Sequence, residues 1–98
     1  MQALDDLLHL VQSDGAESLR LHIGQPPVVI MDGRPHPLEG PPITAEDAER
    51  FLRSLANTRQ RRELRQHGGV QFIYRFRRVA DFVVMVRLAD GQVAIDIC

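Results

Sequence analysis

Residues 70–97 read VQFIYRFRRVADFVVMVRLADGQVAIDI, and this stretch decides the fold. Apolar side chains occupy every second position in two successive runs, the period of strands that bury one face. The pair Asp90-Gly91 is a strong two-residue hairpin signal and is followed by a third alternating run. The stretch therefore predicts three antiparallel strands, whose alternating residues are Val70, Phe72, Tyr74 and Phe76, then Phe82, Val84, Val86 and Leu88, then Val93, Ile95 and Ile97.

The preceding residues predict helices and two further strands. Apolar residues from Leu4 to Val11 recur at helical spacing, and strands are expected at 19–23 and at 28–32. Residues 33–42 are rich in proline and glycine and predict a surface loop. Helices are expected from Thr44, as N-cap, to Leu55 and over roughly 59–66, where Gly68-Gly69 ends them. The order helix, two strands, two helices, three strands predicts an α+β domain with an antiparallel sheet.

Composition indicates one small domain with an uneven charge distribution. The chain has 98 residues and a formal charge of −1. Residues 1–49 sum to −7, residues 50–78 to +8 and residues 79–98 to −2, and every basic residue is arginine. The single Cys98 excludes a disulfide framework. Without a signal-peptide pattern or a long apolar run, we expect a cytoplasmic protein that does not insert into a membrane.

The residues that usually carry catalysis form no recognisable pattern. A P-loop is excluded because the chain has no lysine. The four histidines are scattered without metal-ligand spacing, and no serine lies in a nucleophile motif. We therefore expect neither an enzyme nor a cofactor or metal site.

Arginines are concentrated between residues 59 and 78. Arginine favours two-pronged capture of carboxylates or phosphates. Three readings are open: a solvated face paired with the chain's own acids, a docking surface for an acidic protein, or a nucleic-acid site. Nucleic acid is the least favoured, because the aromatic residues are needed for the core. The candidate protein-contact residues are Arg59, Arg61, Arg62, Arg65, Arg75, Arg77 and Arg78.

A second candidate contact surface is the face of the sheet opposite the core. If Phe82, Val84 and Val86 point inward, Val83 and Met85 point outward. Met31 and Val29 on the second strand, and Ile73, are expected to do the same. An outer face this apolar is either covered by the first helix, which we favour, or is a protein-contact surface that includes Met31, Val83 and Met85.

The residues also resemble a known family. The run from Ala16 to Pro27 with Asp32-Gly33, the entry Pro42-Ile43-Thr44-Ala45-Glu46-Asp47, and Arg61-Arg62-Glu63-Leu64 before Gly69-Val70-Gln71-Phe72 are similar to the opening of the type IV pilus retraction (PilT) and type II secretion ATPases. The resemblance covers essentially the whole chain. It implies that residues 1–98 are a single PAS-like domain with helices on one face of the sheet, corresponding to the family's N-terminal domain without the RecA-like motor domain.

Several polar positions depart from the family pattern. Ser18 stands where the family usually has aspartate and Arg20 where it has histidine. The segment Ala80 to Met85 lacks the family's two arginines and asparagine. In the family, such positions serve subunit contacts and communication with the nucleotide. These departures predict that any nucleotide-linked role is lost.

The favoured function is a non-catalytic interaction or assembly domain linked to type IV pilus, twitching-motility or type II secretion machinery. Its partners would be proteins: a second copy, packed head to tail through unlike charges, or a component of a pilus or secretion motor. Two alternatives stay open. One is a PAS-like small-ligand sensor with Phe51, Phe72, Tyr74 and Phe82 around a cavity. The other is an N-terminal fragment of a longer hexameric ATPase.

Overall fold

A computed structural model describes residues 3–98 and shows three helices and six strands. None of the helices in this range is long and apolar enough to cross a membrane. In chain order, the elements are α1 (Leu4–Ser13), β1 (Ser18–His22), β2 (Val28–Met31), β3 (Arg34–Pro37), α2 (Ala45–Leu55), α3 (Thr58–His67), β4 (Gly69–Phe76), β5 (Ala80–Ala89) and β6 (Gln92–Ile97).

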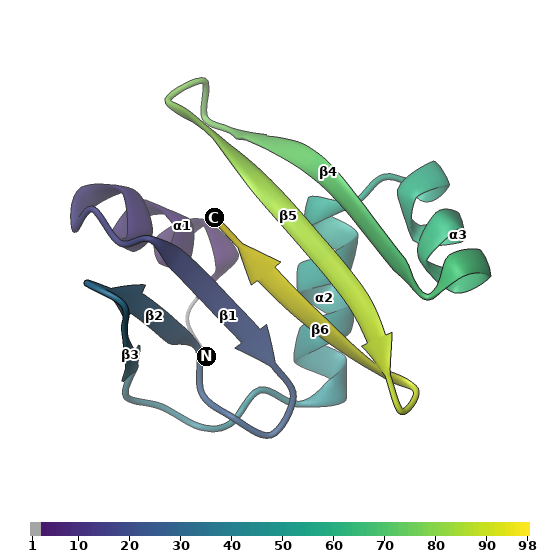
Figure 1. The fold of residues 1–98 in the computed structure, drawn as a ribbon, viewed down its shortest axis with the longest axis horizontal. Coiled ribbons are helices and arrows are strands. Elements are labelled where there is room, and N and C mark those ends of the chain that lie inside the picture. The colour runs from purple at the N-terminus through teal and green to yellow at the C-terminus, as the bar shows by residue number, and fades with distance from the viewer. Residues whose placement is uncertain (1–2) are drawn as a thin grey trace.

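The strands form one antiparallel sheet in the order β3-β2-β1-β6-β5-β4 (Figure 1). Each half of the sheet is a set of neighbours in sequence, and the two halves meet where β1 pairs with the C-terminal strand β6. In that pairing Leu19 lies opposite Ile97 and Leu21 opposite Ile95. The predicted α+β class with an antiparallel sheet is therefore confirmed.

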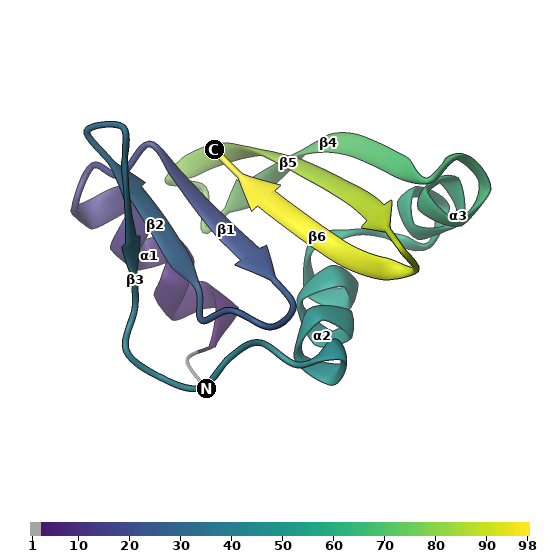
Figure 2. The ribbon, with the colours of Figure 1, turned by 60° about the horizontal axis from the view of Figure 1, so that its bottom comes forward.

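The helices α1 and α2 cover the same face of the sheet (Figure 2), as the resemblance implied. The buried leucines and valine of α1 join the buried face of α2 and the inward side chains of β1, β5 and β6 in one core. Leu19, Leu21, Val84, Ile95 and Ile97 have no exposed surface at all. We call this covered side the inner face and the opposite side the outer face.

Local sequence signals fix the start of α2 and both ends of α3. The hydroxyl of Thr44 accepts from the N–H of Asp47 at 3.1 Å, and the Asp47 carboxylate accepts from the N–H of Thr44 at 3.0 Å. Asn57 and Gln60 form the same reciprocal cap at the start of α3. Gly68 ends α3 with a φ of 79°, a left-handed conformation that glycine adopts without steric cost.

The prediction of a loop over 33–42 is wrong for residues 34–37, which form the edge strand β3. Pro35 lies opposite Ile30 and Pro37 opposite Val28. Proline has no N–H to donate, but every second N–H of an edge strand points away from the sheet and needs no partner in the ladder. The two prolines therefore mark an edge strand here and do not exclude a strand.

Two predictions about the outer face are also wrong. Val29 is opposite Leu19 and only 3% exposed, so Val29 and Met31 lie on the inner face and pack against the core. This removes the reason for grouping Met31 with Val83 and Met85. The first helix does not cover the outer face either, because its apolar residues enter the core on the inner face.

The capping box at Thr44 yields a pH-dependent prediction. Hydrogen bonds from Thr44 lower the pKa of Asp47 below its ordinary 3.8. The backbone N–H of Thr44 contributes most, its hydroxyl contributes less, and the charge of Arg50 makes a smaller contribution. The folded protein thus favours the ionised carboxylate. That contribution to stability is complete above the unfolded pKa and is lost as the pH falls through the folded one.

We expect Asp47→Asn to lower the free energy of unfolding at neutral pH and to have less effect as the pH falls below about 4. Urea titrations at a series of pH values measure this difference. Asp6→Asn is the matched control, because Asp6 lies in the first turn of α1 and its side chain makes no hydrogen bond with another residue of 3–98. Equal loss of stability at neutral and acid pH in Asp47→Asn would contradict the assignment.

Candidate interaction cleft

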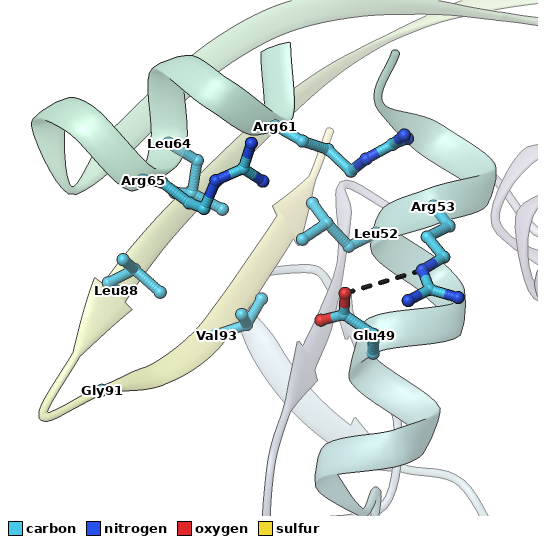
Figure 3. Close-up of a pocket in the computed structure, with 9 residues that line it drawn as sticks. All are labelled: Glu49, Leu52, Arg53, Arg61, Leu64, Arg65, Leu88, Gly91 and Val93. Atoms are coloured by element: carbon cyan, nitrogen blue, oxygen red, sulfur yellow. Dashed lines mark ion pairs between the residues drawn. The ribbon is translucent and has the colours of Figure 1, made fainter. Parts of the chain in front are cut away.

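A surface cleft of about 670 Å³ lies between α2, α3 and the hairpin that joins β5 to β6 (Figure 3). Three separate segments of the chain form this cleft. The hairpin turn at Gly91 places Leu88 and Val93 beside the two helices. The lining residues are Glu49, Leu52 and Arg53 from α2, Arg61, Leu64 and Arg65 from α3, and Leu88, Gly91 and Val93 from the hairpin.

The floor of the cleft is apolar. Leu52 and Leu64 belong to the core and are 5% and 2% exposed. Leu88 is 38% exposed, and Val93 is half-buried against the core. A partner side chain placed on this floor would remove Leu88 from water, which favours binding by about 25 cal/mol for each Å² buried.

The rim of the cleft is basic, with three arginines and one glutamate. Arg53 Nε lies 3.6 Å from Glu49 Oε1 within α2. Arg61 donates to the carbonyl of Ala56 at 2.5 Å, so its guanidinium fastens the turn between the two helices. Arg65 forms no ion pair with any residue in 3–98, and Figure 3 shows its side chain extending from α3 toward α2. Arg65 is the rim cation available to a partner.

The predicted arginine cluster divides into two groups at opposite ends of β4. The first group lies on α3 and consists of Arg59, Arg61, Arg62 and Arg65. The second lies at the β4–β5 turn and consists of Arg75, Arg77 and Arg78. Residues 69–74 of β4 separate the two groups, or about 20 Å along the strand. A partner could therefore contact one arginine group without contacting the other.

The second group is partly engaged within the chain, as the solvated-face reading expects. Arg75 Nε is 3.1 Å from Asp81 Oδ1, across the β4–β5 ladder. Arg77 lies over the ring of Phe76, 4.9 Å from its centroid, and 3.5 Å from Asp5 Oδ2 of α1. Arg77 and Arg78 have φ values of 50° and 57°, a left-handed conformation that non-glycine residues rarely adopt.

The outer face has a polar centre. His22 Nε2 is 3.0 Å from Asp96 Oδ1, and Arg87 lies 4.0 Å from the other carboxylate oxygen. These residues line a second cleft of about 590 Å³ together with Ser18, Arg20 and Met85, three of the positions that depart from the family pattern. Val83, Met85 and Ile73 do lie on this face, as predicted, and Met85 and Ile73 are 41% and 61% exposed.

The four aromatic residues proposed for a ligand cavity line neither cleft. Phe51 and Phe82 are buried in the core, and Phe72 and Tyr74 pack against it. Within residues 3–98, no group of three or more His, Cys, Asp or Glu side chains is placed to hold a metal ion.

Sequence reasoning identified Arg61 and Arg65 but missed the other half of the cleft. Glu49 and Arg53 carried a local signal, because they are four residues apart on a helix and form an ion pair there. For Leu88 and Val93 the sequence gives only the hairpin signal at Asp90-Gly91, which lies between them. Their approach to α2 and α3 depends on the tertiary fold, which no local pattern shows.

Comparison with known proteins finds several solved structures of similar fold, among them the following two. The pilus retraction motor PilT, solved with bound ADP, superposes with a TM-score of 0.88 at 28% identity over 99% of this chain. The Legionella pneumophila ATPase DotB superposes with a TM-score of 0.71 at 19% identity over 96% of this chain. The chain spans 29% of the PilT chain and 27% of the DotB chain. No protein-family model and no curated protein matches. The chain is thus a PilT N-terminal-like domain in its fold, and the predicted resemblance is confirmed.

The two roles assigned to arginines of α3 can be separated by substitution. Arg61→Ala removes a charge-assisted bond to the Ala56 carbonyl, and we expect it to lower the free energy of unfolding by about 1 kcal/mol. Arg62→Ala is the control, because Arg62 is exposed on the same helix and should change stability by less than about 0.5 kcal/mol. Urea denaturation measures both, and equal effects would contradict a structural role for Arg61.

Proposed function

We propose that this chain is a non-catalytic protein-binding domain that works with type IV pilus or secretion machinery. The superposition on the retraction motor PilT at 28% identity is the observation that carries the link to this machinery. The cleft between α2, α3 and the β5–β6 hairpin is the binding surface proposed for a motor component. Its apolar floor and basic rim fit a partner segment that presents carboxylates beside an apolar side chain.

The charges in and around the cleft support an acidic partner. Three arginines face one glutamate, and that glutamate is already paired with Arg53. An incoming carboxylate would therefore meet Arg65 without displacing an internal ion pair. Charge-assisted bonds of this type are shorter and stronger than neutral ones, and arginine can hold a carboxylate with two parallel bonds. The volume of the cleft is enough for a few side chains of a partner. This is consistent with a small contact within a larger assembly.

The departures from the family pattern support a binding role separate from nucleotide chemistry. Ser18, Arg20 and Met85 come together at the outer-face cleft, while Asp81 is paired with Arg75 at the far end of β5. A communication surface toward a motor would need its polar groups at these positions. Because those groups are replaced, the outer face presents a different set of side chains for contact, while the fold is unchanged.

The test measures binding of the purified chain to a purified PilT-type motor hexamer at low and high salt. We expect saturable binding that weakens as salt rises, because screening acts on exposed charges. Arg65→Glu should weaken it by about tenfold or more, because a repulsive charge replaces an attractive one.

Arg78→Glu is the matched control, since Arg78 is also exposed and forms no ion pair within residues 3–98. It reverses the same charge far from the cleft and should bind like the unmodified chain. Equal weakening by both variants would show a general charge effect and would contradict the cleft as the site. No binding of the unmodified chain would contradict the proposed function itself.

A further inference from the structure

The two edges of the sheet differ in length and in protection. The edge strand β3 has four residues, of which Pro35 and Pro37 carry no N–H. The other edge strand, β4, has eight residues and no proline. Natural edge strands are usually kept short, or carry proline or lysine, because an open edge is a template for pairing with another chain. The edge at β4 has none of these protections.

The backbone groups of β4 that face outward can be identified from the ladder. The N–H of Leu88 donates to the carbonyl of Gly68 at 2.9 Å, which makes these two residues a hydrogen-bonded pair. Because such pairs alternate along an antiparallel ladder, Val70, Phe72 and Tyr74 also turn their backbone groups toward β5. The N–H and C=O groups of Gln71, Ile73 and Arg75 therefore point away from the sheet.

An independent contact agrees with this assignment. Val83 and Cys98 exchange two backbone bonds of 2.7 and 2.9 Å, so the backbone groups of Val83 face β6. The next residue, Val84, must then face β4, where it lies opposite Phe72. No turn, loop or side chain of residues 3–98 makes a hydrogen bond to the backbone of Gln71, Ile73 or Arg75.

The side chains along this edge are nearly uncharged and partly apolar. Arg75 is the only charged residue of β4, and the chain as a whole has no lysine to place there. Ile73 is 61% exposed on the outer face, and among the large apolar residues of 3–98 only Val79 is more exposed. On the inner face, Val70, Phe72 and Tyr74 are only partly covered. A strand added at this edge would bury apolar surface on both faces.

We propose that two copies of this chain pair through β4, antiparallel and around a two-fold axis beside Ile73, to form one continuous twelve-stranded sheet (two sheets of six strands). Ile73 of one copy lies opposite Ile73 of the other, and Gln71 lies opposite Arg75. Because these residues carry the outward backbone groups, each of the three residue pairs exchanges two N–H to C=O bonds. The sheet edge is thereby closed.

The sequence of β4 favours this register among the two-fold registers that are centred on an outward-facing residue. Centred on Ile73, the pairing places two exposed isoleucines together and Phe72 opposite Tyr74, which are favourable cross-strand pairs. Centred on Arg75, it would place two arginines directly opposite each other, which is destabilising. Centred on Gln71, it would leave Ile73 opposite Gly69, with no side chain to pack against. Of the three registers centred on an outward-facing residue, the one around Ile73 is therefore the self-complementary one, which favours a second copy as the occupant.

The experiment measures the molar mass of the full chain by sedimentation equilibrium over a range of concentrations, at low and high salt. We expect a monomer–dimer equilibrium that high salt does not dissociate, because it rests on backbone bonds and apolar contacts. Ile73→Pro removes one outward N–H from each copy and no bond of the β4–β5 ladder. It should weaken dimerisation by about tenfold or more.

Ile73→Lys is the second variant and covers the case in which proline prevents folding; it should also give a monomer, because two like charges would lie opposite each other. Val79→Lys is the matched control. Val79 is 63% exposed, close to the value for Ile73, but it lies in the turn outside β4 and should leave the dimer intact. Circular dichroism shows whether each variant is folded.

Four results would overturn the proposal. They are a monomer at every concentration, a dimer that survives in folded Ile73→Pro and Ile73→Lys, a dimer lost equally in Val79→Lys, and a dimer that dissociates at high salt. The last would assign self-association to head-to-tail contact between unlike charges. Amide exchange gives a second readout: Gln71, Ile73 and Arg75 should gain protection with concentration, while Phe72 and Tyr74 are protected throughout. Each of these outcomes is independent of the cleft and of the proposed function.

Discussion

The pairing of β1 with β6 is the constraint on which the rest of the structure depends. It is the only contact between neighbouring strands within residues 3–98 that joins the two halves of the sheet. Leu19 and Leu21 meet Ile97 and Ile95 there, and all four side chains are fully buried. Because β6 is the last strand, the acidic first half of the chain and the arginine-rich second half become one domain only when the C-terminal strand has been placed.

This arrangement also determines which surfaces are left open. With α1 and α2 both on the inner face, the core is closed on one side, and the outer face faces solvent. The third helix lies at one end of β4, where it forms the cleft with α2 and the β5–β6 hairpin. The domain therefore offers two separate contact surfaces: a basic cleft suited to an acidic partner, and a free strand edge suited to a second copy.

The sequence predicted most elements of the fold and little of the surface geometry. Alternation identified β4, β5 and β6, because each strand has one apolar and one mixed face. It failed for Met31, because all four residues of β2 are apolar and their parity is undefined until Val29 is paired with Leu19. The prolines of β3 predict a loop, and only the edge position of this strand makes them compatible with a strand.

The candidate site was predicted as far as local spacing allows. Arg61 and Arg65 are one turn apart on α3 and could be found in the sequence. The distance between the two arginine groups, and the approach of Leu88 to α2, follow from the order of the strands. The free backbone edge of β4 carries no sequence signal of its own, because it exists only if β4 is the last strand of the sheet.

The most direct test of the account is the cross-strand contact between Arg20 and Asp96, measured by nuclear magnetic resonance. Cys98 directs its backbone toward β5, so Ile97 is hydrogen-bonded to Leu19 and the next pair, Arg20 with Asp96, is a non-hydrogen-bonded pair. Such pairs have Cα atoms about 4.5 Å apart. We predict a strong Overhauser effect between the two Hα atoms. Its absence in the folded protein would contradict the pairing of β1 with β6 and the sheet order built on it.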